Sequence, residues 1–128
     1  MGPAGYVVAY ALAEANLRLG LVVVADSVNP LPATRDAWRS VAALASSPII
    51  EIEIICSDAA EHRRRVESRA SDIPGLVPPA WAAVIARDYE PWSEPRMIID
   101  TAKMRAVEAA QAIIAAIAER SGCSPSPI

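Results

Sequence analysis

Histidine and cysteine are scarce in this sequence of 128 residues, and their scarcity limits the catalytic sites that it can carry. His62 is the only histidine, so any Ser-His-Asp triad has to include it. Its setting in "EHRRR", however, is typical of a solvent-exposed helix. Cys56 and Cys123 lie far apart and lack the spacing of metal ligands. We therefore expect no metal site, and a reducing, cytoplasmic setting.

Long apolar runs and an excess of positive charge are also missing. No apolar run reaches the roughly 18 residues of a membrane span, and the last hydrophobic stretch is interrupted by Gln111 and Glu119. The first residues lack the basic and apolar segments of a secretory signal. The net charge of −3 gives no basic surface for nucleic acid. We therefore expect neither a membrane nor a nucleic acid as a partner.

Hydrophobic residues, in contrast, are abundant at 53% of the sequence. A chain of this length and composition is expected to form one domain with its own core. We expect that domain to span residues 1–121 and the polar residues 122–128 to form a disordered tail.

Segments with the pattern of strands alternate with segments of helical spacing. The segment "LVVVAD" (residues 21–26) is continuously apolar and β-branched, as in a strand covered on both faces. In "IIEIEIIC" (49–56) isoleucines alternate with Glu51 and Glu53, which predicts one wetter face. The predicted strands span 21–26, 49–56 and 96–101, and the predicted helices span 5–20, 34–45, 59–70, 79–89 and 104–120. This order predicts an α/β fold with a parallel sheet of three strands and helices on both faces.

The helix ends carry signals of their own. Gly20 is placed to end the first helix. Thr34 and Asp58 are suitable N-caps for the second and third helices. Helical spacing in the second helix predicts a buried stripe of Trp38, Val41 and Leu44.

Each predicted strand ends in polar residues, and parallel α/β sheets bind ligands beyond the carboxyl ends of their strands. Asp26 ends the first strand, where a carboxylate can hold a Mg²⁺-bound water or accept a hydroxyl proton. The alternative is that Asp26 only shapes the turn that follows. The three strand ends are Asp26-Ser27, Cys56-Ser57-Asp58 and Asp100-Thr101-Ala102.

Two arginines on the third predicted helix form a second candidate site. Arg65 and Arg69 lie four residues apart on one helix face, where their guanidinium groups can bind phosphate oxygens. The loop of residues 71–79 follows directly, as a lid does. The alternative is a solvated helix face stabilised by the pairs Glu61–Arg65 and Arg63–Glu67.

The order of these segments carries a resemblance to a known family. "ADSVNP" with "TRDAW", followed by "IIEIEIICSD", "EHRRRVESR", "YEPW" and "MIIDT", resembles bacterial P-loop kinases of the AAA-ATPase-like predicted-kinase group. Those proteins are related to the chloramphenicol phosphotransferase, zeta-toxin and adenylate kinase families. The resemblance covers residues 4–115 and implies a P-loop NTPase-like fold. It also implies phosphoryl transfer from ATP, with Mg²⁺, to a small-molecule hydroxyl.

The matching positions imply a role for each candidate residue. By this resemblance Asp26 lies near Mg²⁺, and the lid arginines Arg65 and Arg69 stabilise the transferring phosphoryl group. The implied acceptor-binding residues are Ser27, Asn29 and Arg35, and the residues implied to border the adenine are Thr101, Ala102 and Lys103.

The sequence departs from this family at its phosphate-binding loop. Its only lysine, Lys103, follows Ala102, and none of its five glycines forms a GxxxxGK[ST] motif. The family's second strand, with its acidic residue, is missing too, so Met1 resembles a truncated start. We therefore expect weak or absent ATP binding and no useful phosphoryl transfer by the chain alone. A non-catalytic kinase-like binding module is the alternative.

The same departure bears on assembly. In the family's strand order, 2-3-1-4-5, the three predicted strands match strands 3, 4 and 5, so the missing strand 1 separates the first two. With strands about 4.8 Å apart, its loss leaves a gap of roughly 10 Å in the sheet. The gap can close by direct pairing of the first two strands, by strands from a second copy or by strands from another chain. Because direct pairing leaves the first strand with an apolar free edge, we expect a homodimer or a strand exchange.

Overall fold

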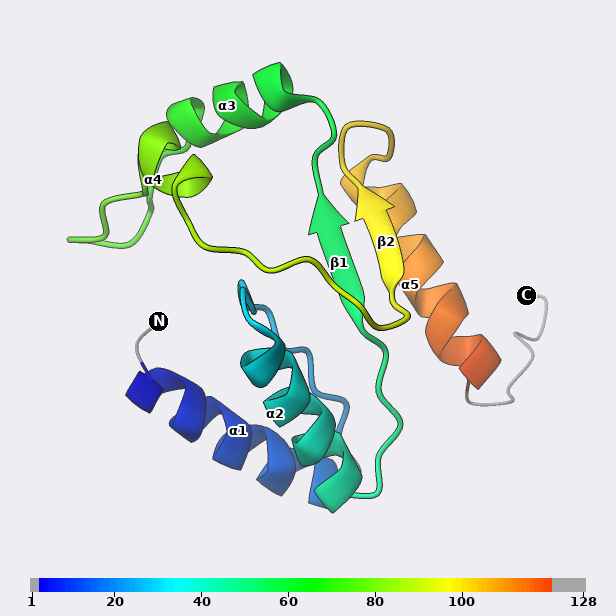
Figure 1. The fold of residues 1–128 in the computed structure, drawn as a ribbon. Coiled ribbons are helices and arrows are strands. Elements are labelled where there is room, and N and C mark those ends of the chain that lie inside the picture. The colour runs from blue at the N-terminus through cyan, green and yellow to red at the C-terminus, as the bar shows by residue number, and fades with distance from the viewer. Residues whose placement is uncertain (1–2, 121–128) are drawn as a thin grey trace. The chain divides into compact units, whose positions relative to one another are not determined.

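The computed structural model describes residues 3–120 and contains two compact units, which are treated separately below (Figure 1). Unit 1 comprises Met1–Ile49 and Asp88–Ser93, and unit 2 comprises Ile50–Arg87 and Glu94–Ile128. The elements are α1 (Pro3–Arg18), α2 (Pro32–Leu44), β1 (Ile52–Ile55), α3 (Ala59–Ser68), α4 (Trp81–Ile85), β2 (Met97–Asp100) and α5 (Ala106–Arg120). The mixture of helices with a parallel sheet confirms the general α/β character. The expected tail of residues 122–128 lies outside the described residues.

Unit 1 is built on the pair of helices α1 and α2. Ala13 of α1 and Val41 and Ala42 of α2 are buried, and the ring of Tyr10 meets that of Trp38 edge-on at 4.6 Å between centroids. The predicted burial of Val41 is confirmed. Leu44, at the end of α2, is 62% exposed, so its predicted burial is wrong.

The helix ends follow the predicted signals in part. Gly20, at a φ of 78°, follows the end of α1 and occupies the left-handed region that favours glycine. Asp58 caps α3 as expected, since its side chain accepts a hydrogen bond from the Glu61 amide. Thr34 is not the N-cap of α2. Leu31 takes that position because Pro32, which lacks an amide proton and has a fixed φ, begins the helix.

The segment of residues 21–26 does not form the predicted strand. Val22 and Val24 are 83% and 87% exposed, and Leu21 is 53% exposed. Within the described residues, the peptide groups of Val22 to Ala25 have no hydrogen-bond partner. A strand is stabilised by its neighbours in a sheet, and this segment has none. The predicted three-stranded sheet is therefore corrected to two strands in the part of the chain that the structure describes.

Unit 2 contains that sheet, in which β1 and β2 pair in parallel with Ile52 opposite Met97 and Ile55 opposite Asp100. Ile99 is its most buried residue, with 1% exposure. The prediction that the glutamates lie on the more solvent-exposed face of this strand is wrong for Glu53. Glu53 is 9% exposed, whereas Ile54 on the other face is 65% exposed. Glu53 is buried because Arg96, just before β2, donates a 2.6 Å hydrogen bond from Nε to its Oε2.

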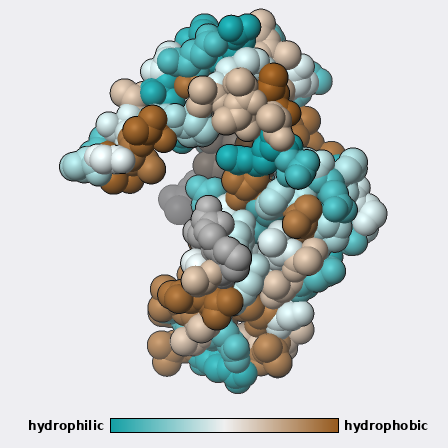
Figure 2. All heavy atoms as spheres, turned by 60° about the vertical axis from the view of Figure 1, so that its left-hand side comes forward, coloured by the Kyte–Doolittle hydropathy of each residue, from teal (hydrophilic) through white to brown (hydrophobic). Residues whose placement is uncertain are grey.

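Hydrophobic side chains remain at the surface of both units, as the brown atoms in Figure 2 illustrate. Besides the residues of the 21–24 segment, they include Val7, Val8 and Leu12 of α1 and Val107 and Ile114 of α5, each more than half exposed. Among the described residues, no helix combines the length and the apolar character needed to span a bilayer.

The Glu53–Arg96 pair is expected to hold the two strands in register. Replacing Glu53 with Ala should lower the free energy of unfolding by about 2 kcal/mol, because the partly buried guanidinium of Arg96 loses the hydrogen bond and the charge of this carboxylate. The matched control is Glu67→Ala, which breaks the exposed Arg63–Glu67 pair and should change stability by less than about 1 kcal/mol. Urea unfolding measures both; equal losses would contradict the structural role of Glu53.

Candidate functional site

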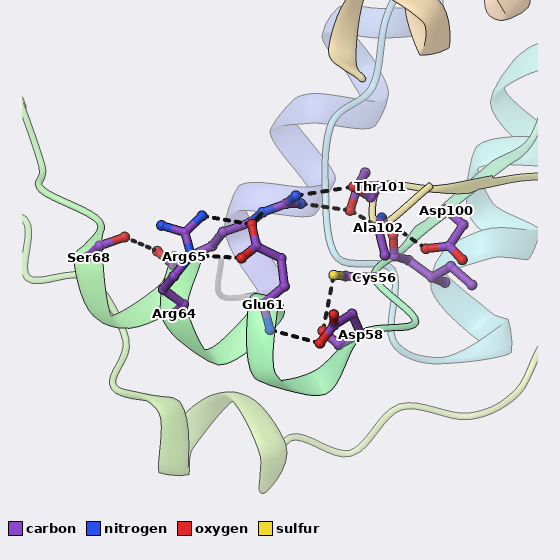
Figure 3. A network of polar contacts seen from close by, with 10 residues as sticks. Cys56, Asp58, Glu61, Arg64, Arg65, Ser68, Asp100, Thr101 and Ala102 are labelled. Atoms are coloured by element: carbon purple, nitrogen blue, oxygen red, sulfur yellow. Dashed lines mark hydrogen bonds and ion pairs between the residues drawn. The ribbon is translucent and has the colours of Figure 1, made fainter. Parts of the chain in front are cut away.

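The carboxyl ends of β1 and β2 meet at one edge of the sheet in unit 2, and this edge is the candidate site (Figure 3). Thr101 extends the ladder by one residue, since its amide donates to the Ile55 carbonyl at 2.8 Å. The Thr101 hydroxyl donates to the same carbonyl at 2.9 Å. Thr101 is therefore held by two hydrogen bonds to β1.

Asp100 connects the turns that follow the two strands. Its Oδ1 accepts from the Ser57 amide at 3.0 Å and from the Ala102 amide at 3.1 Å. Its Oδ2 lies 3.4 Å from Nζ of Lys103. The hydrogen bonds from the side chain and backbone of Ser57, followed by those from Ala102 and Lys103, hold the pKa of Asp100 well below its ordinary 3.8.

Arg65 reaches this edge from α3. Its Nη1 donates to the Thr101 hydroxyl at 3.1 Å and its Nη2 donates to the Thr101 carbonyl at 3.2 Å. Its Nε donates to Glu61 at 2.6 Å. The hydrogen bonds from Arg64 and then Arg65 lower the pKa of Glu61 to about 2. Arg65 is thus fixed between a carboxylate on its own helix and the end of β2.

The helix-face alternative for α3 is supported in part. Both expected pairs are present, Glu61–Arg65 at 2.6 Å and Arg63–Glu67 at 2.7 Å. Arg69 follows the last residue of α3 and is exposed, and its side chain has no hydrogen-bond or ion-pair partner among the described residues. An open hollow of about 440 Å³ on this helix is lined by His62, Arg64, Arg65, Val66, Ser68 and Arg69.

In unit 1, Arg35 is only 2% exposed. Its guanidinium lies 4.4 Å from the ring of Trp92 and 5.2 Å from that of Tyr89. Its N–H groups donate to four backbone carbonyls, those of Asn29, Pro30, Glu90 and Pro91. Arg35 therefore ties the turn before α2 to the segment Asp88–Ser93.

Ser27 and Asn29 lie in the turn before α2, which also provides the Asn29 and Pro30 carbonyls. The Ser27 hydroxyl and the Trp38 indole N–H both donate to Oδ1 of Asn29, each at 3.0 Å. Asn29 has a φ of 46°, a left-handed conformation that asparagine tolerates better than most residues. Asp26, just before them, is exposed and has no partner among the described residues.

The structure thus gathers the predicted site residues into two groups, apart from Asp26 and Arg69, which are exposed and have no side-chain partner among the described residues. Thr101, Ala102 and Lys103 lie with Arg65 in unit 2, whereas Ser27, Asn29 and Arg35 lie together in unit 1. Their assigned roles remain predictions. The sequence analysis assigned Asp100 only a place at a strand end and did not predict that it connects two turns. The signal that could have indicated this role is an aspartate followed by a threonine at the end of a strand.

The described residues alone do not form a binding site for Mg-ATP. The only lysine, Lys103, lies against Asp100, and the sequence contains no GxxxxGK[ST] loop whose amides could surround the β- and γ-phosphates. Between residues 3 and 120, no three His, Cys, Asp or Glu side chains come together as metal ligands. What this edge of unit 2 offers is the guanidinium of Arg65, which contacts Thr101 and pairs with Glu61.

Comparison of the chain with protein families, with curated proteins and with solved structures finds no match. The candidate site therefore has to be interpreted from its own residues.

The contacts of Asp100 predict a pH dependence at the acid end. Because its folded pKa is lowered, its stabilising contribution is present above pH 3.8 and is lost as the pH falls through the lowered value. A carboxyl-detected NMR titration should give a midpoint for Asp100 clearly below 3.8. The variant Asp100→Asn should show a smaller change in stability between about pH 5 and pH 2. A midpoint at or above 3.8 would contradict the contacts described.

Proposed function

We propose that this chain is the arginine-bearing part of an ATP-dependent kinase for a small-molecule hydroxyl, which acts together with a segment that supplies the phosphate loop. The observation that supports the proposal is the position of Arg65, which Thr101 and Glu61 hold at the carboxyl edge of two parallel strands. Parallel α/β sheets bind their ligands at that edge.

Arg65 keeps part of its hydrogen-bonding capacity for a ligand. A guanidinium has five N–H donors, one on Nε and two on each terminal nitrogen. The described contacts use one donor on each of the three nitrogens, so one N–H on Nη1 and one on Nη2 remain. The side chain is 44% exposed. These two donors can bind phosphate oxygens without breaking the contacts to Thr101.

Arg69 adds a second positive charge one turn further along. Phosphoryl transfer depends mainly on positioning and on stabilising negative charge, and fixed guanidinium charges serve the second purpose. Within this proposal Arg65 is the held group and Arg69 the mobile one, because only Arg65 is tied to the sheet. The acceptor is a small molecule whose identity the site does not specify.

A second candidate function is a non-catalytic interaction module with a kinase-like fold. It is favoured by the exposed hydrophobic side chains of residues 21–24, α1 and α5, because large apolar surfaces commonly bind partners. The two candidate functions differ in whether Arg65, at the carboxyl ends of β1 and β2, binds phosphate.

Binding of tripolyphosphate, followed by amide chemical shifts, distinguishes them. We expect weak, millimolar-range binding that shifts the amides of Thr101 and of the last turn of α3. Arg65→Ala should weaken this binding about tenfold, since one charge-assisted contact contributes roughly 1.5 kcal/mol or more. The matched control Arg63→Ala removes an arginine of the same helix that is somewhat more exposed and pairs with Glu67, and it should have little effect. Equal effects of the two variants, or shifts located elsewhere, would favour the interaction module.

Mg-ATP itself should bind weakly or not at all to the purified chain, because no phosphate loop is present. Isothermal titration calorimetry measures this directly. Submicromolar affinity would show that residues other than a phosphate loop hold the nucleotide.

A further inference from the structure

The segment Asp88–Ser93 belongs to unit 1, although the residues on both sides of it belong to unit 2. It lies between α4, which ends at Ile85, and β2, which begins at Met97. The chain that builds unit 2 therefore supplies one segment of unit 1, and we call this segment the strap. The contacts that hold the strap in unit 1 also act on the chain of unit 2.

Arg35 of α2 holds the strap through hydrogen bonds and ring contacts. Its Nη2 donates to the Glu90 carbonyl and its Nη1 donates to the Pro91 carbonyl. The ring centres of Tyr89 and Trp92 lie 5.2 and 4.4 Å from its guanidinium carbon. Four consecutive residues of the strap thus contact one side chain.

The same side chain is anchored to the turn before α2. Its Nε donates to the Asn29 carbonyl and its Nη2 to the Pro30 carbonyl, which also accepts from the Glu90 amide at 2.8 Å. The described bonds use four of the five N–H donors of the guanidinium, and Arg35 is only 2% exposed. Arg35 therefore binds carbonyls of its own chain and has little capacity left for an acceptor.

The strap compensates the buried charge of Arg35. The guanidinium stays protonated at any working pH, and none of its described contacts is with a carboxylate. Carbonyl dipoles and aromatic rings stabilise the charge instead, and the strap provides two of the four carbonyls and both rings. The stability of unit 1 therefore depends on the strap being in place.

We propose that Arg35 is a clasp that couples the unfolding of the two units. When unit 2 is folded, α4 and β2 hold both ends of residues 86–96, so the strap within them loses little chain entropy on binding to Arg35. When unit 2 unfolds, the strap becomes a flexible segment with a lower effective concentration at Arg35. The free energy of folding unit 1 therefore depends on unit 2, and by linkage the reverse holds too. The proposal goes beyond the proposed function, because that function uses neither Arg35 nor the strap.

Urea unfolding of the intact chain, followed by amide NMR signals, tests the coupling. Ala42 in α2 reports on unit 1, and Thr101 reports on unit 2. We expect one common midpoint in the parent chain, since coupled units unfold in one transition. In Arg35→Ala the Ala42 midpoint should fall below the Thr101 midpoint by about 0.5 M urea or more. Arg35→Lys keeps the charge but loses the forked hydrogen bonds, so it should also separate the midpoints and keeps the test decisive if Arg35→Ala does not fold.

The matched control is Val41→Ala, which destabilises unit 1 without removing the clasp. Val41 is 7% exposed and is not among the described hydrogen-bond partners of the strap. This variant should lower both midpoints together, because the strap stays bound to Arg35. Separate midpoints in the parent chain, or a common midpoint in both Arg35 variants, would overturn the proposal. So would a separation in Val41→Ala as wide as that in Arg35→Ala.

Discussion

The organising interaction in this protein is the short parallel ladder between β1 and β2, extended by Thr101. Because the amide and hydroxyl of Thr101 both donate to the Ile55 carbonyl, the two strand ends are held at the same edge. Asp100 then fixes the turns after both strands through the Ser57 and Ala102 amides. The position of the Arg65 side chain depends on Thr101 as well, since two of its three described hydrogen bonds are made with that residue.

The small size of this sheet also limits how many apolar side chains the protein can bury, because two strands offer little surface for a core. Ile99 is almost fully buried, yet Ile54 on the neighbouring strand is 65% exposed. In unit 1, the buried core residues are Ala13, Val41 and Ala42. The many exposed apolar side chains are more readily understood if further strands or helices cover them. The segment that the proposed function requires would supply such a cover.

Local signals predicted several features that depend on nearby residues, although the N-cap of α2 is Leu31 and not Thr34. Asp58 caps α3, Gly20 follows α1, and the pairs Glu61–Arg65 and Arg63–Glu67 form as their spacing indicates. Properties that depend on distant residues were not predictable. Glu53 is buried because Arg96 reaches it from 43 residues away, and Arg35 is buried by carbonyls and rings of the Asp88–Ser93 segment. The segment Leu21–Asp26 has the composition of a strand, but composition does not supply the neighbour that a strand needs.

Hydrogen exchange at the Thr101 amide tests the role of the ladder most directly, because this amide donates to the Ile55 carbonyl at the end of β1. The account predicts that it exchanges more slowly than the amides of Val22 to Ala25, which have no partner among the described residues. Equally rapid exchange at the Thr101 amide would contradict the account, because the ends of β1 and β2 would then not be held together.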